Sequence, residues 1–273
     1  MAREQADSGT SQASRLAEAR RRGGLVYSGL YGVRWMGQQV LDWLDRRLIA
    51  VEQREGIVEP WAIMSKRLST EENRRLWDTY DWSSLGEEWT PNEDWKRSVI
   101  QDLIEPHVRR GSVVVEIGPG GGRWTEVLQR LASRLYLVDV SETPLNLCRE
   151  RFSSRGHIEY LLSDGRSLPV QDAAIDVIWS FDCFVHINPL DIRQYFHEFA
   201  RALRPGGLAL IHHAGPPQPG RPLRSGMRSD MTDRMAVQFA GDAGLEVVSQ
   251  TTRLVNPGDV LTTLKKPDAA LAS

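Results

Sequence analysis

From about residue 106 onward, short apolar runs rich in β-branched residues alternate with segments of helical character. The runs SVVVEIG, LYLVDV, IEYLLSD, IDVIWSF and LALIHH are typical of buried strands. Between them lie segments such as LDIRQYFHEFARAL, whose apolar residues recur every three or four positions. A helix at about 229–243 and two strand candidates, LEVVSQTT and DVLTTLKK, follow. The alternation predicts an α/β fold: a mainly parallel seven-stranded sheet over 106–267, with helices on both faces and a short tail at 268–273.

The residues before this domain predict a different organisation. Residues 1–24 are polar and predict a flexible arm, whereas 25–105 predict an α-helical, Trp-rich extension. The apolar spacing at 33–55 predicts a helix whose face packs on its own domain or forms a homodimer contact. Residues 61–98 hold five of the nine tryptophans. Such rings in a polar setting line a ligand site or pack as a cap, and we select Tyr80, Trp82 and Trp89 as lid or substrate candidates.

Composition excludes several classes of function. The formal net charge is −2, which does not favour nucleic acid or a membrane surface as a partner. The N-terminus lacks the apolar core of a secretory signal, and no apolar run reaches the length that spans a bilayer. The two cysteines form no metal or disulfide pattern. We therefore expect a cytoplasmic protein that binds neither nucleic acid nor a membrane and holds no metal.

The run VVVEIGPGGGRW, residues 113–124, carries the most chemical information. A dinucleotide fold uses G-x-G-x-x-G to place a pyrophosphate on a helix N-terminus. Here Gly118, Gly120 and Gly122 follow a strand, but Arg123 stands where the last glycine would fall, and Glu116 precedes the turn. A carboxylate there repels a pyrophosphate and suits a ligand with an ammonium group. A nicotinamide-dependent dehydrogenase remains the alternative, if Glu116 tolerates a pyrophosphate.

Two more acids follow the next strands along the chain. Asp139 ends the second strand, where an acid hydrogen-bonds ribose hydroxyls. Asp164 follows the third strand, where a carboxylate accepts from an exocyclic amine such as that of adenine. The carboxyl ends of parallel strands meet at one edge, so the three carboxylates are predicted to converge on one crevice.

Residues 106–265 resemble the class I S-adenosylmethionine-dependent methyltransferases of the small-molecule type, which have a Rossmann-like fold. The resemblance rests on VEIGPGGGRWTEVL, YLVDVS, SDGRSLPVQDAAIDVIWSFDCFVHI and FARALRPGGLALIHH, in this order. It implies S-adenosyl-L-methionine as cofactor. It also implies cofactor contacts from Glu116, Gly118, Pro119, Gly120 and Gly122 to the methionine part, Asp139 to ribose, Val140, Asp164 and Gly165 around adenine, and the backbone of Ser180 and Phe181 along the pocket.

The acceptor is constrained mainly by what the sequence lacks. The fourth strand is not followed by the Asn-Pro-Pro-Tyr motif of many amino-methylating enzymes, and SFDCFVHI resembles the version of small-molecule enzymes. A hydroxyl acceptor needs a base, and His186, His212 and His213 follow the fourth and fifth strands. Because side chains alternate along a strand, only one of His212 and His213 is expected to face the substrate. Asp182 is a further candidate as base or orienter.

The loop at 215–231 is expected to border the acceptor. Its Arg221, Arg224 and Arg228 either hold a phosphate or carboxylate of the substrate or form a solvated basic loop. The hypothesis is therefore an O-methyltransferase acting on a small molecule such as a sugar or specialised metabolite. Two alternatives stay open: an N-methyltransferase acting on a small amine, and a catalytically inactive scaffold that binds S-adenosylmethionine. Methylation of RNA or protein would require a basic face or an added module, and neither is evident.

Overall fold

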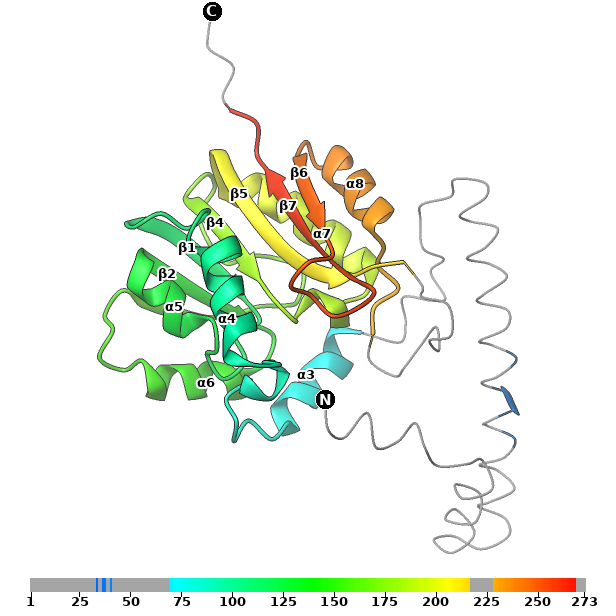
Figure 1. The fold of residues 1–273 in the computed structure, drawn as a ribbon, viewed down its shortest axis with the longest axis horizontal. Coiled ribbons are helices and arrows are strands. Elements are labelled where there is room, and N and C mark those ends of the chain that lie inside the picture. Colours follow the sequence, from blue (N-terminus) through cyan, green and yellow to red (C-terminus); the bar gives the residue numbers. More distant parts are fainter. Residues whose placement is uncertain (1–32, 34–35, 38–39, 41–68, 217–227, 269–273) are drawn as a thin grey trace, which may run out of the picture. The chain divides into compact units, whose positions relative to one another are not determined.

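The computed structural model describes residues 33, 36–37, 40, 69–216 and 228–268 (Figure 1). The chain divides into two units, and the elements considered below all belong to the larger, which spans 58–219 and 224–273. The helices are α3 (Thr70–Thr79), α4 (Glu93–Val99), α5 (Thr125–Leu131), α6 (Glu142–Arg151), α7 (Pro189–Ala202) and α8 (Asp233–Asp242), with short helical turns at η2 (Glu87–Trp89), η3 (Ile100–Ile104) and η4 (Phe184–His186). The strands are β1 (Ser112–Ile117), β2 (Ala132–Asp139), β3 (Ile158–Leu162), β4 (Ile175–Ser180), β5 (Leu203–Ala214), β6 (Glu246–Thr251) and β7 (Asp259–Lys265).

The seven strands form one sheet in the order β3-β2-β1-β4-β5-β7-β6. Strands β1 to β5 are parallel, and β7 runs antiparallel between β5 and β6. The predicted mainly parallel seven-stranded sheet is confirmed. The chain leaves β1 toward β2 and β3 on one side, and returns to β4 on the other side of β1. In open α/β sheets such a reversal of strand order marks the place, beyond the carboxyl ends of the strands, where ligands bind.

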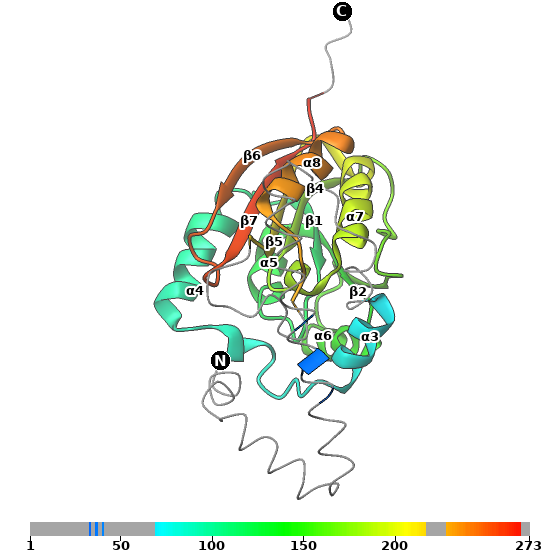
Figure 2. The same ribbon diagram turned by 90° about the vertical axis from the view of Figure 1, so that its right-hand side faces the viewer.

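Two layers of helices cover the sheet (Figures 1 and 2). One apolar core joins β1 to α7 and α8, through residues such as Val115, Phe199 and Phe239. The other core joins the opposite face of the sheet to α4, α5 and α6, and includes Val114 and Leu128. Adjacent Val114 and Val115 belong to different cores, because successive side chains of a strand point to opposite faces. Both faces of the sheet are therefore buried, as a parallel sheet requires.

Helix α7 shows how the sequence fixes one of these elements. The side chain of Asn188 accepts from the backbone N–H of Asp191, and Pro189 occupies the first turn. Both features are typical of a helix N-terminus. The predicted apolar side, with Ile192 and Phe199, is fully buried. Thus α7 is fixed by a local start signal and by burial of one face.

Two predicted boundaries differ from the structure. The helix predicted through LASR ends at Leu131, and β2 begins at Ala132, which lies opposite Ser112 of β1. Residues 132–134 belong to the sheet because they pair with β1. The spacing of apolar residues within one segment does not reveal such a contact with another strand. The helix predicted from 229 begins at Asp233, where Thr232 caps it by accepting from the N–H of Met235.

The N-terminal extension is described only in part. Val33, Met36 and Val40 lie in a helical segment and are exposed. The arm at 1–24 and most of the helix predicted at 33–55 lie outside the described residues, so the homodimer contact stays a prediction. Within the described ranges, none of the helices combines the length and apolar character needed to cross a membrane.

The packing of α7 gives a stability prediction. Phe199 is fully buried against the rings of Phe184, Tyr195 and Phe196. We expect Phe199→Ala to lower the free energy of unfolding by about 3–5 kcal/mol, because it removes a large side chain from a closed core. Urea denaturation measures the loss. The matched control is Leu190→Ala on the same helix, where the side chain is 42% exposed and the loss should stay below about 1 kcal/mol. Equal losses in the two variants would contradict the packing described here.

Candidate active site

The turn after β1 is enclosed closely on several sides. Gly118 and Gly120 have φ of 72° and 55°, in the left-handed region that favours glycine. A Cβ on Gly118 would lie 2.5 Å from Sγ of Cys183, and one on Gly120 would lie 2.7 Å from the ring of Trp82. The N–H of Gly122 donates to the carbonyl of Pro119 at 2.9 Å and closes the turn. The backbone of this turn thus lies so close to Cys183 and Trp82 that a side chain at Gly118 or Gly120 would clash with them.

Glu116 lies one residue before the end of β1 and is 2% exposed. Its Oε2 accepts from Oγ1 of Thr125, the first residue of α5, at 2.6 Å. Burial raises the pKa of Glu116 to about 7, although the Thr125 hydrogen bond and the charges of Arg123 and Arg151 act in the opposite direction. A positively charged group bound nearby would favour the ionised carboxylate. This behaviour suits the ammonium group predicted from the sequence.

Asp139 is the last residue of β2 and is also buried. Its Oδ1 accepts from the backbone N–H of Ser141 at 3.0 Å, and half-buried Val140 follows it. Burial raises the pKa of Asp139 to about 7. Oγ of Ser141 donates to Asp78 at 2.6 Å, so the end of α3 is joined to the start of α6 directly beside Asp139. The carboxylate therefore lies where the ribose-binding acid was expected, next to a segment of the N-terminal extension.

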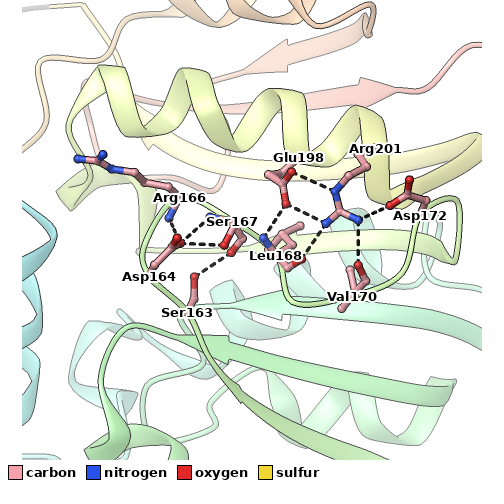
Figure 3. A network of polar contacts seen from close by, with 9 residues as sticks. All are labelled: Ser163, Asp164, Arg166, Ser167, Leu168, Val170, Asp172, Glu198 and Arg201. Atoms are coloured by element: carbon pink, nitrogen blue, oxygen red, sulfur yellow. Dashed lines mark hydrogen bonds and ion pairs between the residues drawn. The ribbon is translucent and has the colours of Figure 1, made fainter.

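Asp164 differs in character from the first two acids because it is exposed. Its Oδ1 accepts from the N–H groups of Arg166 and Ser167 and from Oγ of Ser167 (Figure 3). Partial burial favours the neutral form, but these hydrogen bonds lower the pKa of Asp164 overall. The same loop is tied to α7, because Arg201 donates to the carbonyls of Leu168 and Val170 (Figure 3). One oxygen of Asp164 thus shapes the turn in which this residue lies.

Gly165, next to Asp164, connects the loop after β3 to the N-terminal extension. It has φ of 80° and is buried, and an added Cβ would lie 2.5 Å from the side chain of Thr70 at the start of α3. Nδ2 of Asn73 on α3 donates to the carbonyl of His186 at 2.9 Å. Helix α3 is thus held at the loop after β3, at η4 after β4 and at the start of α6. It lies over the edge of the sheet where the predicted cofactor residues gather.

These residues fit S-adenosylmethionine as a ligand. Glu116 supplies a buried carboxylate beside a glycine turn, which suits an ammonium group, and Asp139 supplies an acceptor for hydroxyl groups. Ser180 is buried, and its Oγ donates to the carbonyl of Ile117, so the ends of β1 and β4 are held together. Phe181 stacks on Trp179, and both rings belong to the apolar core that also contains Val114 and Leu128. Among the described residues, no cluster of three or more His, Cys, Asp or Glu is arranged to hold a metal ion.

Asp182 and His212 belong to a buried polar network, in which the backbone N–H of Asp182 donates to Nδ1 of His212 at 3.1 Å. The carboxylate of Asp182 pairs with Nη2 of Arg123 at 2.5 Å and lies 3.1 Å from Nδ1 of His212. Desolvation acts against the ionised form, but His212 and Arg123 hold the pKa of Asp182 well below its usual range. Nε2 of His212 lies 3.2 Å from Oδ2 of buried Asp259, without hydrogen-bond alignment, and Asp259 also pairs with Arg228. Asp182 is therefore fully engaged and is better suited to orient than to act as a base.

His213 points to the other face of β5. Its Nδ1 bonds the carbonyl of Ala214 at 2.6 Å, and its Nε2 bonds Oγ1 of Thr262 at 2.7 Å. Burial lowers the pKa of His213 to about 4, so the ring is neutral at pH 7. The expected opposite orientation of His212 and His213 is what the structure shows. Both nitrogens of His213 are therefore hydrogen-bonded to buried partners, one at the end of β5 and the other on β7.

His186 has different neighbours. It is half-buried in η4, and its ring lies 5.2 Å from that of Trp77. Trp77 belongs to a cluster with Tyr80, Trp82 and Trp89, in which every pair of rings is 4.9–6.3 Å apart. We call these four rings the aromatic cluster. The lid candidates are therefore brought together, next to His186 and over Gly120, whereas Arg221 and Arg224 lie outside the described residues.

Several residues near the site were missed or assigned differently from sequence. Asp259 pairs with His212 from a position 47 residues away, and no local pattern signals such a contact. Asp78 and Asn73 hold α3 through partners more than 60 residues away. Arg228, considered as an anion ligand, instead pairs with Asp259. Glu88 could have been noticed in the sequence as an acid within the Trp-rich stretch, and in the structure it accepts a hydrogen bond from Tyr80.

The comparisons with known proteins agree with this geometry. Residues 115–211 match a family model described as "Methyltransferase domain". The chain is 30% identical over 151 residues to a malonyl-(acyl-carrier protein) O-methyltransferase of Xylella fastidiosa, covering 52% of this chain and 50% of that protein. It is 32% identical over 127 residues to a ubiquinone/menaquinone biosynthesis C-methyltransferase of Hahella chejuensis, covering 43% and 47%. The chain contains a class I S-adenosylmethionine-dependent methyltransferase domain.

Solved structures show the same fold. The 4+2 cyclase SpnF aligns with a TM-score of 0.59 at 16% identity, over 74% of this chain and 97% of that one. A SAM-dependent methyltransferase of Aquifex aeolicus aligns with a TM-score of 0.53 at 17% identity, over 69% and 100%. The cofactor of the methyltransferase domain is S-adenosylmethionine. The chain spans about half the length of the curated relatives it matches first. The likeness to a cyclase shows that the fold alone does not define the reaction.

The buried carboxylate of the methyltransferase domain predicts a pH-dependent stability. The pKa of Glu116 is about 7 in the folded protein and about 4.3 in an unfolded chain. The folded state therefore binds the extra proton, and the stability it provides is present below about pH 4.3 and is lost as pH rises to 7. We expect wild-type protein without cofactor to lose about 3 kcal/mol more than Glu116→Gln between pH 4.5 and 7.5, measured by urea denaturation. Glu105→Gln, at an exposed position, is the control, and parallel profiles for wild type and Glu116→Gln would contradict the assignment.

Proposed function

We propose that this chain transfers a methyl group from S-adenosylmethionine to a hydroxyl group of a small molecule. The observation that carries the proposal is the pair of buried carboxylates, Glu116 and Asp139, at the ends of adjacent strands beside a glycine turn. The relatives support methyl transfer in general. Their names include both O- and C-methyltransferases, so the acceptor is argued from this chain's own residues.

The roles of the cofactor residues follow from their chemistry. When bound, S-adenosylmethionine supplies a methyl group on a positively charged sulfur. Glu116 would pair with the ammonium group of the methionine part, and Gly118 and Gly120 allow the close backbone approach. Asp139 would accept hydrogen bonds from the ribose hydroxyls, with Val140, Asp164 and Gly165 around the adenine. The enzyme's contribution is chiefly to hold donor and acceptor in line and to keep water out.

A hydroxyl acceptor must lose its proton as the new bond to carbon forms. Of the three histidines, His212 lies between two carboxylates and His213 is enclosed in the core. His186 is half-buried beside the aromatic cluster that lies over the glycine turn. We assign His186 as the base, with an imidazole nitrogen taking the hydroxyl proton. The cluster rings Tyr80, Trp82 and Trp89 would cover the acceptor and exclude water.

Methylation of a small amine is the second candidate function. It is favoured by the acidic and aromatic surroundings of Glu88, which accepts from the hydroxyl of Tyr80 at 2.8 Å. An amine that arrives neutral needs no base, so His186 would then be dispensable for the chemical step.

The cofactor assignment is tested by calorimetry. We expect micromolar binding of S-adenosylmethionine and no comparable binding of NAD. Asp139→Ala should weaken binding of S-adenosylmethionine at least about tenfold, because two ribose hydroxyls lose their charged acceptor. The control is Asp94→Ala on α4, where the side chain is 88% exposed. Preferential binding of NAD, or an unchanged Kd in Asp139→Ala, would overturn the assignment.

The acceptor assignment is tested by replacing His186. With a hydroxyl acceptor found by screening, His186→Ala should reduce kcat by about 10²–10⁴-fold and remove the acidic limb of the pH–rate profile. His197→Ala, at an exposed position on α7, should leave both unchanged. If turnover persists in His186→Ala, base catalysis by this residue is refuted, and amine acceptors should be screened instead.

A further inference from the structure

The stretch that carries the aromatic cluster has an unusual balance of charge. Between Leu76 and Asp94 the sequence has six acidic residues and no lysine or arginine. The same 19 residues supply all four rings of the aromatic cluster. Aromatic faces together with carboxylates are the groups that proteins use to bind organic cations. The composition of this stretch therefore favours a positively charged ligand.

Glu88 is the carboxylate placed within the cluster. Its Oε1 accepts from the hydroxyl of Tyr80 at 2.8 Å. Its Oε2 is buried and accepts no hydrogen bond from any described residue. Leaving such an oxygen without a donor costs free energy, and a bound N–H group would recover that cost.

The neighbouring Glu87 shows the contrast. Its carboxylate pairs with Nζ of Lys96 and accepts from Oγ1 of Thr90. Glu87 is thus neutralised by Lys96, whereas among the residues that the structure describes Glu88 is hydrogen-bonded by the hydroxyl of Tyr80 alone. Burial, the hydrogen bond to Glu88 and the adjacent negative charges of Glu88 and Asp81 raise the pKa of Tyr80 well above its ordinary value, so its hydroxyl keeps the proton that it donates to Glu88.

The rings themselves carry no protein cation in the described part of the chain. There, arginine guanidinium groups lie over other rings, those of Trp124, Tyr136, Phe152, Tyr160 and Phe239. Trp77, Tyr80 and Trp89 are each half-buried, so part of each ring is accessible. The π faces and the carboxylate of Glu88 thus form a cation-binding surface to which no lysine or arginine of the described ranges contributes its charge.

This surface lies next to the groups assigned to methyl transfer. The ring of Trp82 closes over Gly120, and a Cβ on Gly121 would lie 2.4 Å from the backbone of Leu85. Trp77 contacts His186. A cation held by Glu88 and the cluster would therefore lie beside both the glycine turn and the assigned base.

We propose that Glu88 and the aromatic cluster bind an ammonium group of the methyl acceptor, so that the substrate class is an amino-bearing small molecule. The inference deepens the proposed function and rests on it for the identity of the acceptor. It is compatible with methylation of a hydroxyl on the same molecule, as in an amino sugar or amino alcohol. A neutral sugar or phenol would leave the buried Oε2 of Glu88 without a cation.

The sulfonium of the cofactor is the other cation that could meet these rings. It has no N–H to donate to the free oxygen of Glu88. A carboxylate held against it would also stabilise the positive charge that methyl transfer must discharge, and so would slow the reaction. An ammonium group of the acceptor satisfies both the ring faces and the carboxylate oxygen.

The test measures binding without turnover. Full-length protein saturated with S-adenosylhomocysteine is titrated at pH 7.5 with cyclohexylamine, which is cationic, and with cyclohexanol, its neutral counterpart of similar size. Intrinsic tryptophan fluorescence and calorimetry follow binding. We expect the amine to bind at least about tenfold more tightly than the alcohol, and Glu88→Gln to remove most of that preference. Glu87→Gln is the matched control on the same turn and should retain it.

Each outcome bears on a specific assignment. Equal binding of amine and alcohol by wild type, or an unchanged preference in Glu88→Gln, would overturn the proposal. Thermal unfolding of both variants checks that Glu88→Gln is folded. A Glu88→Gln change in the ratio of Kd values for S-adenosylmethionine and S-adenosylhomocysteine would assign the surface to the sulfonium and also overturn it. If the cofactor fails to bind while the amine preference holds in its absence, the proposed function fails and the cation site stands.

Discussion

The reversal of strand order beside β1 is the constraint on which the rest of this structure depends. Strands β2 and β4 flank β1 on opposite sides, so the chain segments that follow β1, β2 and β4 diverge from one edge of the sheet. Glu116, Asp139 and Ser180 stand at the ends of these three strands. A parallel sheet brings such residues together without any contact between their neighbours in sequence. The site is therefore a consequence of topology before it is a consequence of individual side chains.

The edge of the sheet at the carboxyl ends of these strands is closely packed and contains buried carboxylates. Gly118 and Gly120 let Cys183 and Trp82 approach the turn more closely than any Cβ would permit. Glu116 and Asp139 remain buried, with pKa values near 7, so each carries a desolvation cost in the free protein. That cost falls when a ligand supplies an ammonium group or hydroxyl donors. The same residues that weaken the free protein thereby favour the complex, which is typical of a functional site.

The N-terminal extension contributes as much to this edge as the sheet does. Helix α3 is held by Asn73 to η4 and by Asp78 to the start of α6, so it is joined to the segments that follow β4 and β2. The turn that follows α3 brings the aromatic cluster onto the glycine turn. In the proposed function, the domain shared with the relatives would provide the cofactor residues, and this extension would provide the groups by which the chain selects its acceptor.

The sequence alone determined the fold class, the glycine turn and the acids at the ends of β1 and β2. These are local signals: apolar period, turn residues and a carboxylate at a fixed distance from a glycine, each of which acts over a few residues. It placed Asp164 correctly after β3, but it did not reveal that this carboxylate closes its own turn. Only the tertiary structure decided which of His212 and His213 lies beside Asp182, the pairing of Asp182 with Arg123, and the hydrogen bond between Tyr80 and Glu88. The contacts of Asp182 with Arg123 and His212 join residues that are 59 and 30 positions apart in the chain, and all of these contacts depend on burial, which sets the cost of a charge. A local sequence pattern reveals neither these contacts nor the burial, because both arise only when the sheet and its helices have packed.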